Sequence, residues 1–268
     1  MSRARLSASW QDRTTGKDAG ADMTGKVIVI TGANGGLGRA LAQRFADDGE
    51  TVFMLARSLE KVSEVARDVG GKTLPIACDV TSPDSVRAAF AEIARSHPKL
   101  DVLINNAAIF NPFLIEEATD DQIMGAVLTN FAGPVLCCRS AIPMLDRGGQ
   151  IINLSSESVE HPVPHLLMYQ STKSAIERFS KDLHSELEDR NIRVSIVRAG
   201  AMVGPGSSAT MEPEAAMRFL TAAAKKGIDF MTRPVSQYAS TVHLFRTIVD
   251  LPADLHIGLM AYQARPAD

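Results

Sequence analysis

Short apolar runs alternate with longer amphipathic stretches along almost the whole chain from Lys26 onward. The apolar runs are mostly continuous, as expected for strands buried on both faces, and cover Val27–Thr31, Thr51–Ala56, Thr73–Ala77, Val102–Asn105, Ile151–Leu154, Val194–Val197 and His256–Met260. Helix-like stretches between them cover Leu37–Asp47, Leu59–Val69, Pro83–Ser96, Asp120–Leu145, Met168–Asp189 and Pro234–Ile248. This order predicts an α/β protein with a doubly wound, seven-stranded parallel sheet and helices on both faces.

The domain organisation follows from the same alternation. No linker interrupts it, so we expect a single domain over residues 24–268. Residues 202–232 break the rhythm with a Gly/Pro/Ser opening, a short Ala-rich helix and no strand, which predicts a substrate lid. Residues 1–23 are rich in Arg, Ser and Thr, and we expect them to form a disordered extension.

Composition excludes several classes of function. The net charge of −3 argues against nucleic acid or an anionic membrane as a partner. No apolar run approaches the ~18–20 residues of a membrane span. The three cysteines, Cys78, Cys137 and Cys138, show neither a disulfide framework nor metal-ligand spacing, so we expect no metal and a cytoplasmic protein with reduced thiols.

A glycine-rich turn connects the first apolar run to the first helix. Such a turn lets the backbone approach a pyrophosphate, and the following helix supplies free N–H groups and the positive end of its dipole. Its position after the first strand therefore predicts a Rossmann-type dinucleotide site. The candidate phosphate-binding residues are Gly32, Asn34, Gly35, Gly36, Leu37 and Gly38.

The end of the second run indicates which dinucleotide binds. An acid at this position would accept a hydrogen bond from the ribose 2′-OH of NAD, but the chain reads Leu55-Ala56-Arg57-Ser58. The guanidinium of Arg57 instead suits bidentate contact with a 2′-phosphate. We therefore expect NADP(H) to be favoured over NAD(H).

A tyrosine and a lysine stand four residues apart where the fifth helix-like stretch begins. Tyr169 and Lys173 share one helical face, so the ammonium can favour the phenolate and bring proton exchange into range. Ser156 lies thirteen residues before the tyrosine, at the carboxyl edge of the sheet, where its hydroxyl can bind a substrate oxygen. Ser155 competes for that role, and the spacing favours Ser156.

The Ser156/Tyr169/Lys173 spacing and the turn Thr31-Gly32-x-x-x-Gly36-x-Gly38 resemble those of classical short-chain dehydrogenases/reductases. The resemblance extends from about Thr24 to Ala264 and implies interconversion of a ketone or aldehyde with an alcohol, with Tyr169 as acid/base. It implies that Asn130 completes a catalytic tetrad and that Lys173 also binds the nicotinamide ribose. Further cofactor contacts implied by the resemblance are Asp79, Val80, Asn106, Ala107, Tyr169, Gly200 and Met202. Family members commonly pair through the helices at 120–145 and 168–189, which implies a homodimer or homotetramer.

The chain departs from the family pattern at three positions. Ala108 replaces a glycine, Ala199 replaces a proline after the sixth strand, and Gly204 replaces a threonine that commonly binds the carboxamide. Cofactor anchoring at that end must rely on backbone groups, such as those of Met202. We expect altered positioning of the nicotinamide rather than loss of activity.

The substrate is expected to be a rather apolar small carbonyl compound or alcohol. Phe110, Met202, the loop 157–167 and the lid, whose inner face would carry Phe219 and Phe230, should frame it. In that loop we expect His161 and His165 to have no chemical role and Glu157 to orient a polar substrate group or face solvent.

Two other functions remain open on the sequence. One is a dinucleotide-binding regulator without catalysis, against which the complete tetrad argues. The other is a sugar-nucleotide epimerase or dehydratase, because Gly35 also satisfies the TGxxGxxG spacing of the extended branch. Little chain remains after the sixth strand for the substrate domain that this reading requires.

Overall fold

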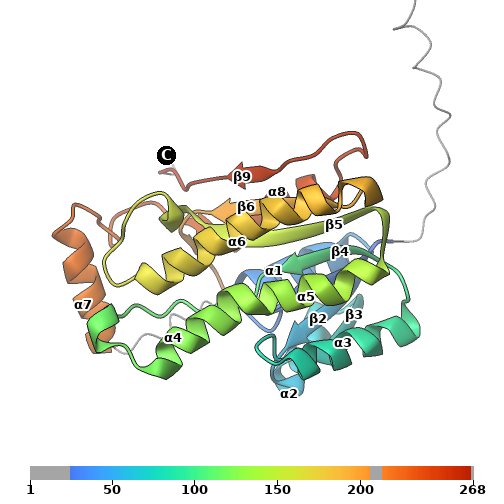
Figure 1. Cartoon of the computed structure of the whole chain (residues 1–268), viewed down its shortest axis with the longest axis horizontal. Helices are drawn as coiled ribbons and strands as arrows, with labels where there is room; N and C mark the ends of the chain where they lie inside the picture. The colour runs from blue at the N-terminus through green and yellow to red at the C-terminus, as the bar shows by residue number, and fades with distance from the viewer. Residues whose placement is uncertain (1–24, 206–212, 267–268) are drawn as a thin grey trace, which may run out of the picture.

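A seven-stranded parallel sheet forms the centre of the molecule, with strand order β3-β2-β1-β4-β5-β6-β9 (Figure 1). The computed structural model describes residues 25–205 and 213–266. The strands are β1 Val27–Thr31, β2 Thr51–Ala56, β3 Lys72–Ala77, β4 Leu100–Asn105, β5 Leu145–Ser156, β6 Arg193–Ala199 and β9 Leu259–Ala261. The strand order reverses between β1 and β4, as in a doubly wound sheet. The predicted Rossmann-type fold with a single domain is confirmed.

Helices cover both faces of this sheet. They are α1 Gly36–Asp47, α2 Leu59–Val69, α3 Pro83–Ser96, α4 Asp120–Val127, α5 Gly133–Ala141, α6 Leu167–Glu186, α7 Pro213–Ala224 and α8 Tyr238–Val249. Successive residues of a strand face opposite layers. Ile28 and Ile30 of β1 pack into the layer that includes α1 and α8, and Val29 packs into the layer that includes α3 and α5.

Helix starts agree with the local sequence. Ser82 caps α3 by accepting a hydrogen bond from the Ser85 N–H at 3.2 Å, and Pro83 occupies the first turn. Thr119 caps α4 in a capping box with Gln122. Both features satisfy N–H groups that a helix end leaves without intrahelical partners.

The helix expected over Asp120–Leu145 is not one continuous α-helix. A π-helical turn, Leu128–Ala132, separates α4 from α5, and Leu145 already belongs to β5. The physical reason is Pro134, which has no N–H to donate to the carbonyl of Asn130 four residues earlier. By length and composition alone the described stretch Asp120–Met144 could cross a membrane, yet Cys137, Cys138 and Ala141 of α5 lie in the core.

The expectation that residues 202–232 contain no strand is wrong. Met202–Val203 forms β7, which pairs in parallel with β8, Ser236–Gln237. The pairing comprises only two residues on each side and is too short to show a sequence period. The predicted extension at 1–23 and part of the predicted lid, 206–212, lie outside the described residues.

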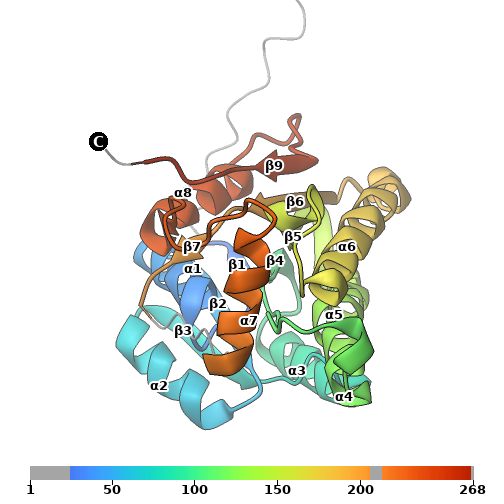
Figure 2. The same ribbon diagram turned by 90° about the vertical axis from the view of Figure 1, so that its left-hand side faces the viewer.

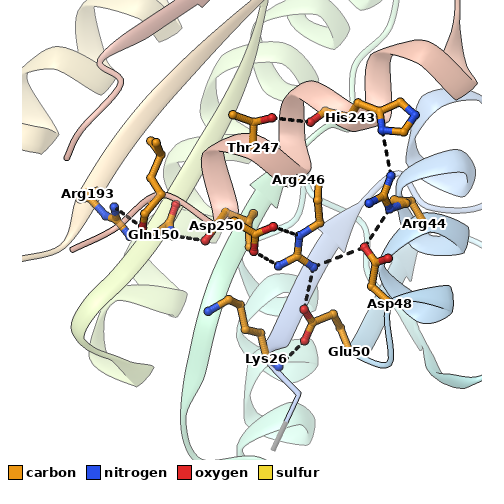
Figure 3. Close-up of polar contacts among 12 residues, drawn as sticks. Lys26, Arg44, Asp48, Glu50, Gln150, Arg193, His243, Arg246, Thr247 and Asp250 are labelled. Carbon is orange, nitrogen blue, oxygen red and sulfur yellow. Dashed lines mark hydrogen bonds and ion pairs between the residues drawn. The ribbon is translucent and has the colours of Figure 1, made fainter. Parts of the chain in front are cut away.

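A group of ion pairs at the amino edge of the sheet ties α8 to the first two strands (Figure 3). The Arg246 guanidinium contacts Glu50 at 2.7 Å, Asp48 at 3.5 Å and Asp250 at 2.6 Å. Glu50 also accepts a hydrogen bond from the backbone N–H of Lys26. Burial lowers the pKa of Arg246, but the hydrogen bonds to Asp250 and Glu50 outweigh it and raise the pKa above its ordinary value.

Replacing Arg246 by methionine should destabilise the fold. Arg246→Met leaves the Glu50 carboxylate, only 7% exposed, without its guanidinium, which should cost about 3 kcal/mol of unfolding free energy. Urea denaturation at pH 7 measures the change. Lys99→Met removes the exposed Lys99–Asp146 pair and serves as the matched control, expected to leave the midpoint unchanged. Equal midpoints for Arg246→Met and wild type would contradict the structural role of these ion pairs.

Candidate active site

The carboxyl ends of the central strands meet at one edge of the sheet. β5 and β6 pair in register up to Ser156 opposite Ala199, and β1 pairs with both β2 and β4. Helix α7 lies across this edge, in front of β1 and β4 in Figure 2. This is the edge where doubly wound sheets bind ligands.

The glycine-rich turn is closely packed against the end of β4. The Asn106 side chain donates hydrogen bonds to the carbonyls of Thr31 at 2.9 Å and Gly32 at 3.2 Å. Gly32 has φ +66°, and a Cβ on Gly38 would collide with the Gly32 carbonyl and the Asn106 amide. Ala107 donates its backbone N–H to the Thr31 hydroxyl at 3.1 Å. Side chains at Gly32 and Gly38 would therefore not fit, and the turn from Gly32 to Gly38 is called the cradle below.

Helix α1 begins beside this cradle with its first turn open. Gly35 occupies the N-cap position, no side chain of the described residues caps the helix, and the first turn carries no acidic residue. Leu37 and Gly38 are buried in this turn, while Asn34 is exposed next to it. The free N–H groups and the helix dipole suit the phosphates of a dinucleotide, so the cradle fits that cofactor.

Residues at the ends of β2 and β3 flank the cradle. Arg57 is exposed and has no ion pair with another residue in the described part of the chain. The Asp79 carboxylate accepts hydrogen bonds from the N–H and the hydroxyl of Thr81, at 3.0 and 2.8 Å. Val80 is buried against Gly133, where a Cβ would stand 3.0 Å from the valine side chain. Asp79 thus shapes its own loop and leaves the capping of α3 to Ser82.

The tyrosine and lysine lie in the first turns of α6. The Lys173 ammonium stands 5.8 Å from the centroid of the Tyr169 ring and donates a hydrogen bond to the Leu154 carbonyl at 2.7 Å. Burial raises the pKa of the Tyr169 hydroxyl, and its hydrogen bond with Ser156 acts in the opposite direction. Lys173 is 3% exposed, and this burial lowers its pKa to about 8.

The two adjacent serines of β5 have different surroundings. Ser155 is 2% exposed and donates its hydroxyl to Glu177 of α6 at 2.7 Å. Arg198 of β6 binds the same carboxylate at 2.9 and 2.7 Å. Burial raises the pKa of Glu177, but the hydrogen bonds from Arg198 and Ser155 lower it overall. Ser156, partly exposed and bonded to Tyr169, is the serine that faces the candidate site.

Asn130 lies in the π-helical turn and is 1% exposed. Its side chain accepts a hydrogen bond from the Ile109 N–H at 2.8 Å and donates one to the Ile109 carbonyl at 3.0 Å. It also donates to the Thr172 hydroxyl at 3.4 Å, next to Lys173. The asparagine therefore joins the loop after β4 to the helix that carries the tyrosine and lysine.

A row of aromatic rings runs from the tyrosine to the lid. Phe110, 46% exposed, contacts Tyr169 edge-on at 5.1 Å between centroids and Phe219 of α7 at 6.0 Å. Phe219 in turn contacts Phe230 at 5.0 Å. This row places α7 against the candidate site.

The loop after Ser156 is organised by one side chain that the sequence did not single out. Gln170 of α6 donates to the carbonyls of Ser158 and His161 and accepts from the Val163 N–H at 3.2 Å. His161 is exposed, and His165 lines a surface hollow beside α7. Among the described residues, neither histidine forms a hydrogen bond with Tyr169, Ser156 or Lys173.

The stretch after β6 is held against two neighbours, Glu157 and Tyr262. Gly200 lies so close to the C-terminal segment that a Cβ would stand 2.8 Å from the Tyr262 carbonyl. Ala201 donates its N–H to Glu157 at 3.1 Å, and the sulfur of Met202 accepts the Tyr262 hydroxyl at 3.8 Å. One of the two expectations for Glu157 was that its side chain faces solvent. The side chain is instead only 17% exposed and forms an ion pair with Arg233.

Comparison with known proteins places the chain in a family. The family model described as short chain dehydrogenase matches residues 26–216. The chain belongs to the short-chain dehydrogenase family. An uncharacterized oxidoreductase of Methylorubrum extorquens is 33% identical over 189 residues, which cover 69% of this chain and 76% of the relative.

Two further members of the short-chain dehydrogenase family illustrate the range of relatives. A 3β-hydroxysteroid dehydrogenase of Mediterraneibacter gnavus is 33% identical over 177 residues, 64% of each chain. A short-chain dehydrogenase of Burkholderia cenocepacia, solved in complex with NADP, superposes with a TM-score of 0.74 over 90% of this chain and 96% of its own, at 24% identity. The solved structure supports the fold, and the sequence matches support oxidoreduction.

The buried amine of this short-chain dehydrogenase predicts a pH-dependent stability. The folded-state pKa of Lys173, about 8, lies below its ordinary value of 10.5, so between these pH values the unfolded chain binds more protons. The cost of burying the charged amine is therefore complete below pH 8 and declines as the pH rises. From pH 7 to 10, wild type should gain about 2–3 kcal/mol of unfolding free energy relative to Lys173→Met.

Urea denaturation of both proteins at several pH values measures this difference. Other titrating groups are common to the two proteins, so their contributions cancel in the comparison. A constant difference across the range would contradict the depressed pKa of Lys173.

Proposed function

We propose that the chain is an NADP(H)-dependent oxidoreductase that interconverts a ketone or aldehyde with an alcohol. The observation that carries the proposal is the Tyr169 hydroxyl, hydrogen-bonded to Ser156 and beside the buried Lys173. All three lie at the sheet edge that carries the phosphate cradle. A bound nicotinamide supplies or accepts the hydride, and the protein residues handle the proton.

The proposed roles follow from these surroundings. In reduction, Tyr169 donates its proton to the substrate oxygen, and in oxidation the phenolate takes it back. Ser156 donates a hydrogen bond to the same oxygen as its charge develops. Charged Lys173 favours the phenolate, which burial alone disfavours. Asn130 fixes the Ile109 backbone and Thr172, and so positions the tyrosine helix against the loop that carries Phe110.

The preference for NADP(H) rests on the end of β2. Arg57 is exposed and unpaired among the described residues, and no acid stands at this position. We assign it to the 2′-phosphate, beside the cradle of Gly32, Asn34 and Gly35–Gly38. The remaining proposed cofactor contacts are Asp79, Val80, Asn106, Ala107, Tyr169, Lys173, Gly200 and Met202. The Burkholderia relative was solved with NADP, which supports a dinucleotide as the cofactor.

The proposed substrate is a rather apolar carbonyl compound or alcohol. Phe110 exposes its ring beside the Tyr169 hydroxyl, and Phe219 and Phe230 continue this apolar surface under α7. The steroid substrate named for the Mediterraneibacter relative supports an alicyclic ketone. We also propose pairing of copies through α4–α5 and α6, and a reducing cytoplasmic setting, which the three free, buried cysteines support.

Removal of the tyrosine hydroxyl should separate chemistry from binding. Wild type should oxidise NADPH with at least one member of a panel of aliphatic, aromatic and steroidal ketones. Tyr169→Phe should lower kcat about 10²–10⁴-fold while NADPH binding persists, because only the proton donor is lost. Absorbance at the NADPH band measures turnover, and NADPH fluorescence measures binding.

Two results would count against the proposal. Comparable turnover by Tyr169→Phe would remove the phenol from the mechanism. NADPH binding by wild type without turnover of any panel member would favour a non-catalytic dinucleotide-binding protein.

A charge reversal at the end of β2 should change the choice of cofactor. Arg57→Asp removes the guanidinium and supplies an acid for a ribose 2′-OH. The ratio of kcat/KM for NADPH to that for NADH should fall about 10- to 100-fold, the range expected for lost charge-assisted hydrogen bonds. Arg67→Asp on α2 makes the same change at another exposed arginine and should leave the ratio unchanged. An unaltered ratio in Arg57→Asp would remove this residue from the cofactor site.

A further inference from the structure

Glu157 directly follows Ser156 and reaches across the end of β6. Its side chain is 17% exposed, and Oε1 accepts the Ala201 N–H at 3.1 Å. The other oxygen would lie 3.5 Å from a Cβ placed on Gly200. A partly buried carboxylate thus lies one residue from the proposed substrate-binding serine and takes no part in the proton transfer proposed above.

The partner of this carboxylate comes from a distant part of the chain. Arg233, 76 positions later, forms an ion pair with Glu157 and stacks over the Phe230 ring at 5.4 Å. Arg233 belongs to the segment between α7 and β8. The ion pair therefore connects three places, which are the end of β5, the backbone after β6 and the segment that follows the lid helix.

This connection occurs where the chain lacks two side chains of the family pattern, at Ala199 and Gly204. A Cβ on Gly204 would collide with the Tyr238 ring, so the structure has no room for a threonine there. The stretch is held from both sides instead. Glu157 binds the Ala201 N–H, and Ser236 donates its N–H and hydroxyl to the Ala201 carbonyl at 3.0 and 3.1 Å.

We propose that Glu157, held by Arg233, is a positioning residue that fixes the backbone of Gly200–Met202 for the nicotinamide end of the dinucleotide. The proposal rests on the proposed function. Ser156 and Ala199 are paired in the sheet, so the residues that follow Ala199 border the reacting groups. A hydrogen bond from an N–H to a charged acceptor is stronger than one to a neutral acceptor, and partial burial reduces competition from water.

The two ends of the cofactor provide the test. NADPH reaches the stretch after β6, whereas 2′,5′-ADP contains only the adenosine end and its 2′-phosphate. A positioning role at the nicotinamide end predicts that Glu157→Ala weakens NADPH binding by about tenfold or more and leaves 2′,5′-ADP binding unchanged within about twofold. Fluorescence titration and calorimetry measure the two affinities without turnover.

Conservative variants separate the hydrogen bond from the ion pair. Glu157→Gln keeps an acceptor for the Ala201 N–H and should recover part of the lost NADPH affinity. Arg233→Met keeps the hydrogen bond but removes the cation, and should weaken NADPH by an intermediate factor. If Glu157→Ala fails to fold, as judged by circular dichroism, these two variants carry the test, and unchanged NADPH affinity in both would overturn the proposal.

A second ion pair on the lid helix supplies the matched control. Arg218 of α7 pairs with Glu117, but both side chains are about half exposed, at 47% and 50%. Glu117→Ala loosens α7 without touching the stretch after β6, and should leave both affinities unchanged. If it weakens NADPH as strongly as Glu157→Ala does, loosening of the lid explains the effect and the positioning role is wrong.

The remaining outcomes are also decisive. Equal losses of NADPH and 2′,5′-ADP affinity in Glu157→Ala would show a general structural defect and overturn the positioning role alone. If wild type prefers NADH, the test uses NADH in place of NADPH and ADP in place of 2′,5′-ADP. Glu157→Ala should then weaken NADH binding and leave ADP binding unchanged. A wild-type protein that binds neither dinucleotide would overturn the proposed function, and the positioning role with it.

Discussion

The in-register pairing of β5 with β6, and of β1 with β4, determines where every polar group of the candidate site can stand. These strands are buried on both faces, so polar side chains along their length would lose water without replacement. Two buried asparagines inside the sheet have such replacements, since Asn105 donates to Asn153 and Asn153 donates to Ser180 of α6, each at 2.8 Å. Polar side chains that bind a ligand are therefore expected at the carboxyl edge, where the parallel strands end together.

Helix α6 places three ionisable side chains near that edge, each in a different environment. Tyr169, Lys173 and Glu177 follow one another at intervals of four residues and so share a face. Glu177, the last of the three along the helix, forms an ion pair with Arg198 and accepts a hydrogen bond from the Ser155 hydroxyl. Lys173 comes next, buried without a carboxylate partner among the described residues, and its pKa falls to about 8. Burial disfavours the charged form of the tyrosine and of the lysine when each is alone. The opposite charges of a phenolate and an ammonium stabilise each other when both are present.

The parts of this arrangement that sequence could predict are those encoded locally. The bounds of β1, β2, α2 and α3 agree with the predicted ranges, because continuous burial defines the strands and Ser58 and Ser82 mark the helix starts. The π-helical turn at Asn130 escaped prediction, since apolar spacing does not report hydrogen-bond pattern, although Pro134 was a usable signal. The Glu157–Arg233 pair depends on two chain segments meeting in space, which no local pattern encodes.

The buried ion pairs and the candidate active site lie at opposite edges of the same sheet. At the amino edge, Arg246 satisfies the buried Glu50 and joins the last helix to the first strands, so its charges are paired and stabilising. At the carboxyl edge, Lys173 is buried at a cost to its charged form. A sheet with tightly packed layers on both faces allows this separation, because it keeps both edges in register. The unfavourable burial of Lys173 can therefore persist at the edge where the proposed ligand binds.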